Sequence, residues 1–299
     1  MVKVAEEWLA VCGGCEVTVL DVGEPLVDLL PQLEFVHIPV LMDHKYYGQI
    51  GEKTELEIPE ADVGIISGGV RLEEHKHIAE EMRKKCKTII ASGACANFGG
   101  VPALGNMYNN EEIFDVVYRK TKSTDPGETP SVDIPPFTDR VYALDEVIKV
   151  DISLPGCPTT PELVAEALTA LLEGKTFTLP EKSVCEDCPL TREKKALTAL
   201  KRPLEQPQPE RCLLELGYLC IGPATRTGCG GAEKVPRCIR ANMPCRGCFG
   251  PIRVGANPLV DMMGALSAIG LDPKDIVDRR AMFNRYIGGQ GRLKPLPAR

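Results

Sequence analysis

The sequence lacks an excess of positive charge. Its 35 Lys and Arg residues are outnumbered by 42 Asp and Glu residues, which gives a net charge of -7 at pH 7. Nucleic-acid binding draws most of its affinity from clustered Lys and Arg, and no basic arm is present, so we expect no nucleic-acid partner. The sequence also lacks a run of about 18 apolar residues, which a bilayer span requires, so we expect no membrane association.

The first eight residues offer no targeting signal. They include two acids and no long apolar run, unlike a signal peptide or a twin-arginine leader. We therefore expect a cytoplasmic protein. Thiols stay reduced in that compartment, so a cysteine-rich chain is expected to bind metal rather than form disulfides.

Cysteine is the residue that this chain has in abundance. Of thirteen cysteines, twelve sort into three sets of four, and each set contains one C-x-x-C pair. The pairs are Cys12/Cys15, Cys185/Cys188 and Cys245/Cys248. Such a pair places two thiolates on one tight turn, and distant cysteines complete a four-thiolate site. Three such sites in one chain indicate electron transport.

The first half of the chain alternates between strand and helix patterns. Apolar runs of strand length occur at residues 8–11, 35–41, 63–66, 88–91 and 147–154. Helices are expected at 72–85 and 161–172, the second beginning with Thr159 or Thr160 as cap and Pro161 at its first position. This alternation predicts an α/β fold, a doubly wound parallel sheet with helices on both faces.

Cysteines follow three of these strands. Cys12 comes after the first strand, Cys95 after 88–91, and Cys157 after 147–154. Ligands bind along the carboxyl edge of an open α/β sheet, and glycines in these loops allow the backbone to approach a bulky cluster. We therefore expect Cys12, Cys15, Cys95 and Cys157 to form one site.

The composition changes after about residue 180. Proline and glycine become dense and the strand alternation disappears, so metal binding is expected to organise this region. The sequence therefore predicts two domains, residues 1–178 and residues 179–299. Short helices at 259–269 and 273–283 are expected to pack the second domain against the first.

Three other interpretations of the cysteines were considered: a zinc-dependent scaffold without redox function, disulfides, and a flavin enzyme. Two C-x-x-C pairs can form a zinc ribbon, but here single cysteines lie between the second and third pairs, namely Cys212, Cys220, Cys229 and Cys238. Flavodoxin-like folds often bind FMN at the same sheet edge, which cysteines occupy here without an evident phosphate-binding loop. The spacing favours iron-sulfur clusters.

Several segments resemble the small subunit of nickel-iron hydrogenases. They are Cys12-Gly-Gly-Cys15, Pro155-Gly-Cys157-Pro158, residues 212–229, Cys238, and residues 244–251 with Cys245 and Cys248. The resemblance is strongest to the viologen-reducing, deazaflavin-non-reducing hydrogenases of methanogens. It implies a flavodoxin-like domain followed by an irregular cluster-binding domain, and a nickel site in the large subunit rather than in this chain.

The resemblance also implies which cluster each set holds. The proximal set, beside the nickel-iron centre, is Cys12, Cys15, Cys95 and Cys157. The medial set is Cys229, Cys238, Cys245 and Cys248. The distal set is Cys185, Cys188, Cys212 and Cys220.

Two positions depart from the better-known periplasmic relatives. Many of those have His where this chain has Cys185, and Pro where it has Cys238. The resemblance therefore implies three all-cysteine 4Fe-4S clusters, which should favour lower potentials. The implied partners are the nickel-iron large subunit, a small iron-sulfur acceptor subunit and the heterodisulfide reductase complex, and the implied process is methanogenesis.

Some residues outside the twelve carry predictions of their own. Cys86 has no second thiol at ligand spacing and is expected to be a free structural thiol. Glu16 is a candidate for a proton path near the nickel-iron centre, although an acid in the first turn of a helix is also favoured by the helix dipole. The basic residues of segment 192–202 are expected to form a solvated helix or a docking face for an acidic acceptor.

Overall fold

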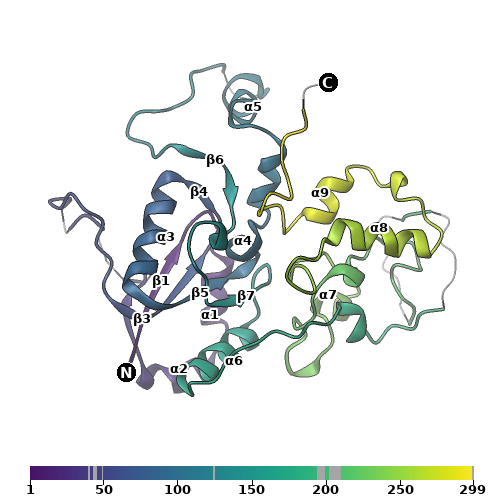
Figure 1. The fold of residues 1–299 in the computed structure, drawn as a ribbon, viewed down its shortest axis with the longest axis horizontal. Helices are drawn as coiled ribbons and strands as arrows, with labels where there is room; N and C mark the ends of the chain where they lie inside the picture. The colour runs from purple at the N-terminus through teal and green to yellow at the C-terminus, as the bar shows by residue number, and fades with distance from the viewer. Residues whose placement is uncertain are drawn as a thin grey trace.

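The structure is a computed structural model that describes residues 1–297, except residues 40, 43–45, 49, 124, 194–198 and 202–209. A sheet with helices forms the first half of the chain, and a less regular part with short helices lies beside it (Figure 1). The basic segment 192–202 falls largely outside the described residues. Among the described residues, no helix has the length and apolarity needed to cross a bilayer.

The centre of the first half is a five-stranded parallel sheet. Its strands are β1 (Val2–Trp8), β2 (Leu33–His37), β3 (Ala61–Ser67), β5 (Cys86–Ser92) and β7 (Ile152–Leu154), in the spatial order β2-β1-β3-β5-β7. Numbered by their sequence among the parallel strands, this order is 2-1-3-4-5, the order of flavodoxin-like sheets. The prediction of a doubly wound parallel sheet is confirmed.

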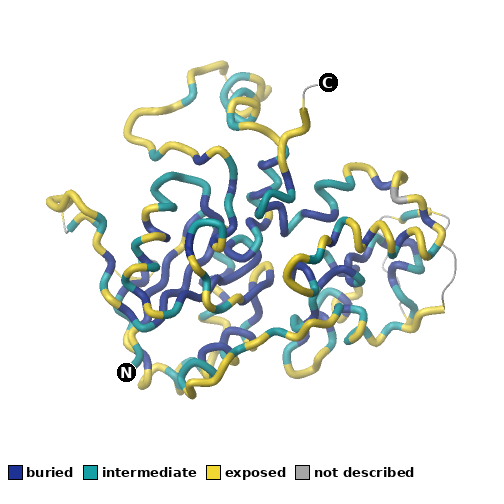
Figure 2. The backbone as a smooth tube through the Cα atoms, in the orientation of Figure 1, coloured by how far each residue is buried: buried dark blue, intermediate teal, exposed yellow. Residues whose placement is uncertain are grey.

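Helices cover both faces of the sheet. They are α1 (Gly14–Leu20), α2 (Glu24–Leu29), α3 (Glu73–Lys85), α4 (Gly93–Phe98) and α6 (Pro161–Leu172). On one face, Ile78 and Met82 of α3 pack against β3 and β5. On the other face, Leu163 and Ala167 of α6 pack against apolar residues of β1, β5 and β7. Figure 2 shows the strands as the most continuously buried part of the chain.

Helix α6 begins as its sequence predicts. The Thr160 side chain caps it by accepting a hydrogen bond of 3.3 Å from the Leu163 amide, and Pro161 occupies the first helical position. Proline is favoured there because its missing N–H would have no helical acceptor. The helix therefore starts at a fixed point, shortly after the loop that carries Cys157.

An antiparallel pair, β4 (Val70–Leu72) and β6 (Phe137–Tyr142), projects from the sheet. The chain between them contains η2 (Pro102–Met107), α5 (Asn110–Asp115) and η3 (Val116–Lys120). Asn109 and Glu112 form a capping box at the start of α5. The sequence patterns did not predict this pair or α5.

The C-terminal part is built from short elements. They are η5 (Val184–Glu186), η6 (Gly222–Ala224), η7 (Gly231–Glu233), α7 (Arg237–Arg240), α8 (Pro258–Ala268), η8 (Pro273–Asp275) and α9 (Arg279–Asn284). Its core combines apolar side chains of α8 and α9 with the thiols of Cys220 and Cys245. The end of the chain returns to the first half, where the Gly289 amide donates to the Phe98 carbonyl at 2.8 Å.

Four predicted elements have different bounds in the structure. The first strand is not 8–11 but β1, because the chain turns away after Trp8 and places Glu6 and Glu7 inside the strand. The second ends at His37, and η4 (Leu144–Glu146) and a turn leave only Ile152–Leu154 of 147–154 as strand. The predicted helix 273–283 is two elements, because Asp278 adopts φ 51° and caps α9.

Gly64 of β3 gives a direct test of core packing. A Cβ there would lie 2.8 Å from the Cys86 Sγ and 2.8 Å from the Ile89 Cδ1. Overpacking of this kind costs about 1–3 kcal/mol, so we expect Gly64→Ala to lower the thermal midpoint of the anaerobically purified protein. Gly264→Ala in α8, where a Cβ meets nothing within 4 Å, is the matched control and should not lower it. An unchanged midpoint for Gly64→Ala would contradict this packing.

Candidate functional site

The proximal set lies at the carboxyl edge of the sheet. Cys12 follows β1, Cys15 lies in the first turn of α1, Cys95 lies in α4 after β5, and Cys157 follows β7. Because the strands are parallel, their carboxyl ends meet at one edge. The fold thus brings together four cysteines that are as many as 145 positions apart, from 12 to 157.

The pKa values of these thiols reflect their burial and their proximity. Burial, together with smaller contributions from the nearby thiols of Cys157, Cys15 and Cys12, raises the pKa of Cys95 to about 12. Burial likewise raises the pKa of Cys15 to about 11, with Cys157 and Cys12 adding to the effect. Each thiol of the set is therefore close enough to interact electrostatically with the others.

Two glycines allow the backbone to approach these sulfurs. At Gly93, with φ +80°, a Cβ would lie 2.3 Å from the Cys15 Sγ, and at Gly100, with φ +57°, it would lie 2.5 Å from the Cys95 Sγ. A side chain at either position would collide with a thiol. The loops thus form a close-fitting cradle around the sulfur atoms, as expected of loops that hold a bulky inorganic group.

Asn97 fixes the loop that carries Cys95. Its side-chain amide is buried and donates to the carbonyls of Ala91 and Gly93, at 2.9 and 2.8 Å, and to that of Leu154 at 3.2 Å. Its Oδ1 accepts a hydrogen bond from Ser153. Because these partners belong to β5, β7 and the first residue of α4, Asn97 links the strands that precede Cys95 and Cys157.

The medial set lies in the C-terminal part, from Cys229, which precedes η7, to the loop before α8. Burial raises the pKa of Cys248 to about 12, and the thiols of Cys238 and Cys229 add to the shift. Burial also raises the pKa of Cys245 well above its usual value, and the thiols of Cys220, Cys248 and Cys238 raise it further. The set therefore forms a second group of interacting thiols.

The distal set lines a cavity of about 180 Å³ at η5, η6 and the segment between them. All four of its cysteines contribute to the lining: Cys185, Cys188, Cys212 and Cys220. Burial raises the pKa of Cys185 to about 12 and that of Cys220 to about 11. At Gly222 a Cβ would come within 3.4 Å of both of these sulfurs, so a glycine again borders the site.

Backbone hydrogen bonds connect neighbouring sets. The Cys245 amide of the medial set donates to the Cys220 Sγ of the distal set at 3.2 Å. A backbone hydrogen bond from Cys157 of the proximal set lowers the pKa of Cys248 of the medial set. The medial set therefore lies between the other two and contacts both.

The thiols fit an iron-sulfur cluster chemically. Cluster ligands are thiolates, and burial without a cationic centre disfavours the thiolate form. A bound metal centre would supply the missing positive charge, so it is the grouping of these thiols, rather than their raised pKa values, that suits them to metal. Among the described residues, no three His, Cys, Asp or Glu side chains lie close enough to share one metal ion; in a four-iron cluster each thiolate binds a different iron.

Glu16, the proton-path candidate, follows Cys15 and is buried. Its Oε1 accepts a hydrogen bond from the Ser67 hydroxyl, and its Oε2 has no hydrogen-bond partner. It lines a groove of about 750 Å³ that also includes Cys12. The Glu16 carboxylate therefore lies in the groove that borders the proximal set at Cys12.

Two buried acids of β1 were not predicted from the sequence. Burial, together with smaller contributions from the charges of Glu16 and Glu7, raises the pKa of Glu6 to about 7. Glu7 lies on the opposite face, fully buried, and accepts hydrogen bonds from the Tyr46 hydroxyl at 2.6 and 2.8 Å. Consecutive acids inside an otherwise apolar strand are the signal that could have revealed them.

Cys86 lies apart from the three sets. It is buried at the start of β5, and burial raises its pKa to about 11. Its sulfur packs beside Gly64, in agreement with the prediction of a structural thiol. His75 and His77 lie on α3, and His37 lies beside Glu7, whereas His44 is outside the described residues.

Comparisons with known proteins give a consistent result. Residues 12–171 match the family described as NADH ubiquinone oxidoreductase, 20 Kd subunit. The chain is 41% identical over 287 residues to a subunit of the vhu F420-non-reducing hydrogenase of Methanocaldococcus jannaschii, covering 95% of this chain and 94% of that protein.

Solved structures resemble the chain as well. A chain of an NAD+-reducing [NiFe]-hydrogenase is 30% identical with a TM-score of 0.54, covering 60% of this chain and 95% of that one. A chain of the Ni-Fe-Se hydrogenase from Desulfomicrobium baculatum is 16% identical with a TM-score of 0.52, covering 91% of this chain and 99% of that one. The second likeness concerns the fold alone and extends into the C-terminal part.

Gly93 provides a test of the proximal set. We expect Gly93→Ala to displace the Cys15 sulfur, because the added Cβ would lie 2.3 Å from it. Loss of one four-iron centre would lower the iron content by about four atoms per chain, which iron analysis of anaerobically purified protein measures. Gly105→Ala, whose Cβ would meet only Ile113 at 3.7 Å, should retain the full content. Full iron in Gly93→Ala would show that this loop does not hold a cluster.

Proposed function

Because the chain belongs to the family of nickel-iron hydrogenase small subunits, we propose that it relays electrons from hydrogen oxidation through three 4Fe-4S clusters to an acceptor subunit that feeds heterodisulfide reductase. The nickel site lies in the large subunit, so this chain contributes conduction rather than hydrogen cleavage. The observation that carries the proposal is the arrangement of three four-cysteine sets in series, with hydrogen bonds between neighbouring sets.

In this proposal each cysteine set holds one cluster through its four thiolates. The proximal ligands are Cys12, Cys15, Cys95 and Cys157; the medial ligands are Cys229, Cys238, Cys245 and Cys248; the distal ligands are Cys185, Cys188, Cys212 and Cys220. When bound, each cluster accepts and releases single electrons. The protein positions the sets and buries Cys15, Cys220 and Cys245, and such burial tunes a reduction potential.

The order of the three cysteine sets indicates the path that electrons take. The Cys157 backbone reaches Cys248, and the Cys245 amide reaches Cys220. A path from the proximal to the medial set therefore crosses one hydrogen bond, and so does the path onward to the distal set. We propose that electrons enter at the sheet edge and leave at the cavity formed by η5 and η6.

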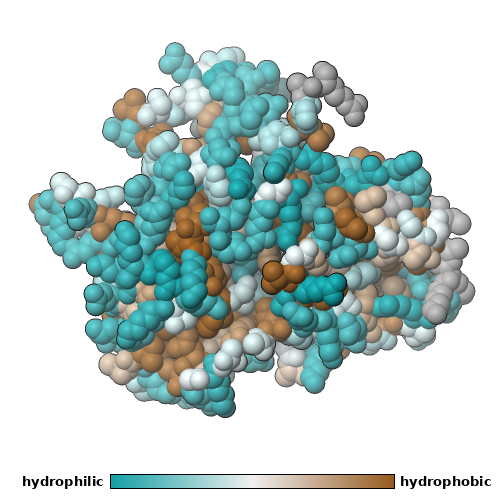
Figure 3. All heavy atoms as spheres, viewed as in Figure 1, coloured by the Kyte–Doolittle hydropathy of each residue, from teal (hydrophilic) through white to brown (hydrophobic). Residues whose placement is uncertain are grey.

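We propose that the large subunit packs against the groove beside Cys12. Apolar side chains dominate this groove, and several are substantially exposed, including Val17 and Leu20 at 55% each and Leu30 at 41%. Figure 3 shows apolar residues gathered at the lower left of the view, around α2. Exposed apolar area of this kind marks protein interfaces, and here it borders the proximal set.

The relatives favour the cytoplasmic branch of the family. The relative from Methanocaldococcus jannaschii belongs to an enzyme named F420-non-reducing hydrogenase, so the acceptor in this proposal is a protein rather than the deazaflavin. All thirteen cysteines are unpaired in the structure, which suits a reducing compartment. We propose a cytoplasmic complex with a small iron-sulfur acceptor subunit, acting in methanogenesis.

We further propose a domain boundary near residue 178. The last helix on the sheet, α6, ends at Leu172, and the chain then runs without helix or strand until η5. Residues 1–178 would form the flavodoxin-like domain with the proximal set, and residues 179–299 the domain with the other two sets. The end of the chain returns across this boundary to the first domain, where Ile287 forms a bridge with Gly100.

Metal analysis tests the relay directly. Three 4Fe-4S clusters predict about twelve iron and twelve sulfide per chain in anaerobically purified complex. Removal of iron with a chelator should also unfold much of the C-terminal part, because little regular structure stabilises it. Stoichiometric zinc without sulfide would contradict the relay and support a zinc-dependent scaffold.

Glu16 tests the proton path. We expect Glu16→Gln to slow hydrogen uptake by roughly 10-fold or more, because the amide cannot carry a proton in the same way. Iron and sulfide content should stay unchanged, since Gln can still accept the hydrogen bond of Ser67. Glu24→Gln in α2, an exposed acid, serves as control. A rate of hydrogen uptake equal to that of wild type would contradict a role of Glu16 in proton transfer.

A further inference from the structure

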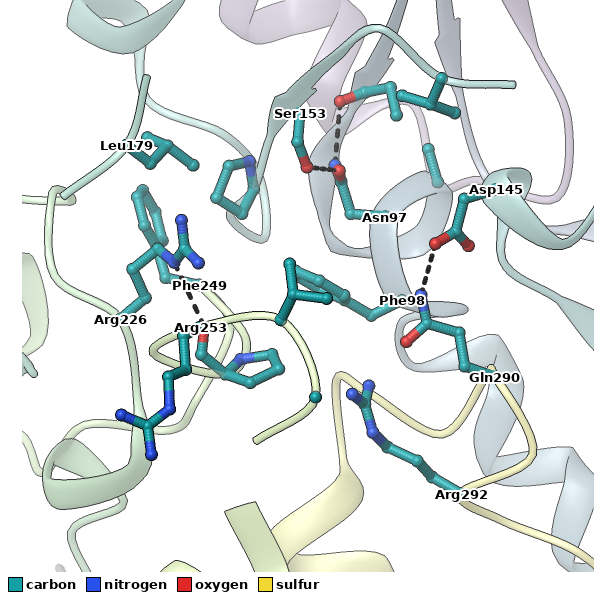
Figure 4. A pocket seen from close by; sticks show the side chains of 17 residues that line it. Asn97, Phe98, Asp145, Ser153, Leu179, Arg226, Phe249, Arg253, Gln290 and Arg292 are labelled. Carbon is teal, nitrogen blue, oxygen red and sulfur yellow. Dashed lines mark hydrogen bonds between the residues drawn. The ribbon is translucent and has the colours of Figure 1, made fainter. Parts of the chain in front are cut away.

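A cavity of about 310 Å³ lies between the sheet and the C-terminal part, outside the three cysteine sets (Figure 4). Asn97 and Ser153 line it from the side of the sheet, and Arg226, Arg253 and Arg292 line it from the later part of the chain. Its volume is within the range of sites for small molecules, about 300–1,000 Å³. The proposed electron relay has no use for it.

The cavity has an excess of positive charge. Three arginines line it against one acid, Asp145, which accepts a hydrogen bond of 2.7 Å from the Gln290 side chain. Within the described part of the chain, none of the three guanidinium groups lies within the 4 Å of a carboxylate that defines an ion pair. The positive charge of the cavity is therefore not balanced by its own walls.

Arg292 is the least satisfied of the three. Its Nη1 is buried and has no hydrogen-bond partner. Burial lowers its pKa, and the more distant charges of Asp145 and Glu146 offset only part of that effect. Arg226 is also partly buried, with a lowered pKa, and only its Nε donates, to the Pro251 carbonyl at 3.2 Å. An arginine stays charged inside proteins, and burying an unpaired charge is costly.

Apolar side chains complete the lining. Phe98, Phe249, Leu179 and Val254 line the cavity, and Phe249 lies on the same side of it as Leu179 and Arg226 (Figure 4). Guanidinium groups beside aromatic rings suit a ligand with an anionic group and an apolar body, because arginine binds phosphate and carboxylate through paired hydrogen bonds. A metal cation or a purely apolar ligand would leave the arginines unpaired.

We propose that this cavity binds a small organic anion with a phosphate or carboxylate group, which pairs with Arg292 and Arg226 while its apolar part contacts Phe98 and Phe249. Phe98 ends the helix that carries Cys95, and Phe249 follows Cys248 directly. An occupant therefore holds the loop of the proximal set against the loop of the medial set.

Calorimetric titration of the purified hydrogenase complex in Hepes and chloride tests the site. The probes are phenyl phosphate, benzoate and inorganic phosphate, so that the anionic group and the apolar body are varied separately. We expect saturable binding of phenyl phosphate or benzoate at one site per chain, more tightly than inorganic phosphate. Arg292→Gln should weaken this binding by about 10-fold or more, as loss of a hydrogen bond to a charged group does.

Two further variants make the outcome decisive. Arg226→Gln removes the second arginine that pairs with the anion and should weaken binding as well, and Arg119→Gln, which pairs with Glu111 outside the cavity, should leave it unchanged. No saturable binding of any probe would overturn the proposal, as would an acidic partner segment found in the cavity of the complex. Equal affinities in wild type, Arg292→Gln and Arg226→Gln would overturn it as well. Iron content, measured in parallel, keeps this result separate from a failure of the relay.

Discussion

The burial of cysteine thiols is the constraint on which the rest of the structure depends. Burial is the largest cause of a raised pKa at Cys15, Cys95, Cys157, Cys185, Cys188, Cys220, Cys229, Cys245 and Cys248. Thiolates in such positions are unfavourable unless a metal centre neutralises them. A bound metal centre would stabilise the thiolate form at these positions, and this would matter most in the C-terminal part, which has few regular elements.

The two halves of the chain position their cysteine thiols by different means. In the first half, parallel strands bring Cys12, Cys95 and Cys157 to one sheet edge, and Asn97 fixes two of the strands to each other. In the second half, the cysteines are themselves part of the core, where Cys220 and Cys245 pack with the residues of α8 and α9. In the proposed relay, the sheet therefore holds rigidly the cluster at which electrons enter. The other two clusters help to order the part of the chain around them.

The sequence predicted the parallel sheet because alternating strand and helix patterns admit few other folds. It also predicted that Cys12, Cys95 and Cys157 follow strands of this sheet, whereas their binding of one cluster together with Cys15 stays a prediction. It did not predict the position of β1, since Glu6 and Glu7 are charged residues that only the tertiary structure buries. The cavity of Arg226 and Arg292 was beyond sequence patterns too, because it is formed by segments that are distant along the chain.

The central claim is that three four-iron clusters lie in series within this chain. Iron anomalous scattering from crystals of the anaerobically prepared complex tests it most directly, because it locates iron without assuming the ligands. The account predicts three iron peaks, each surrounded by one cysteine set, with the peak at Cys229, Cys238, Cys245 and Cys248 between the other two. A set without iron, or a peak order in which the medial set is terminal, would contradict it.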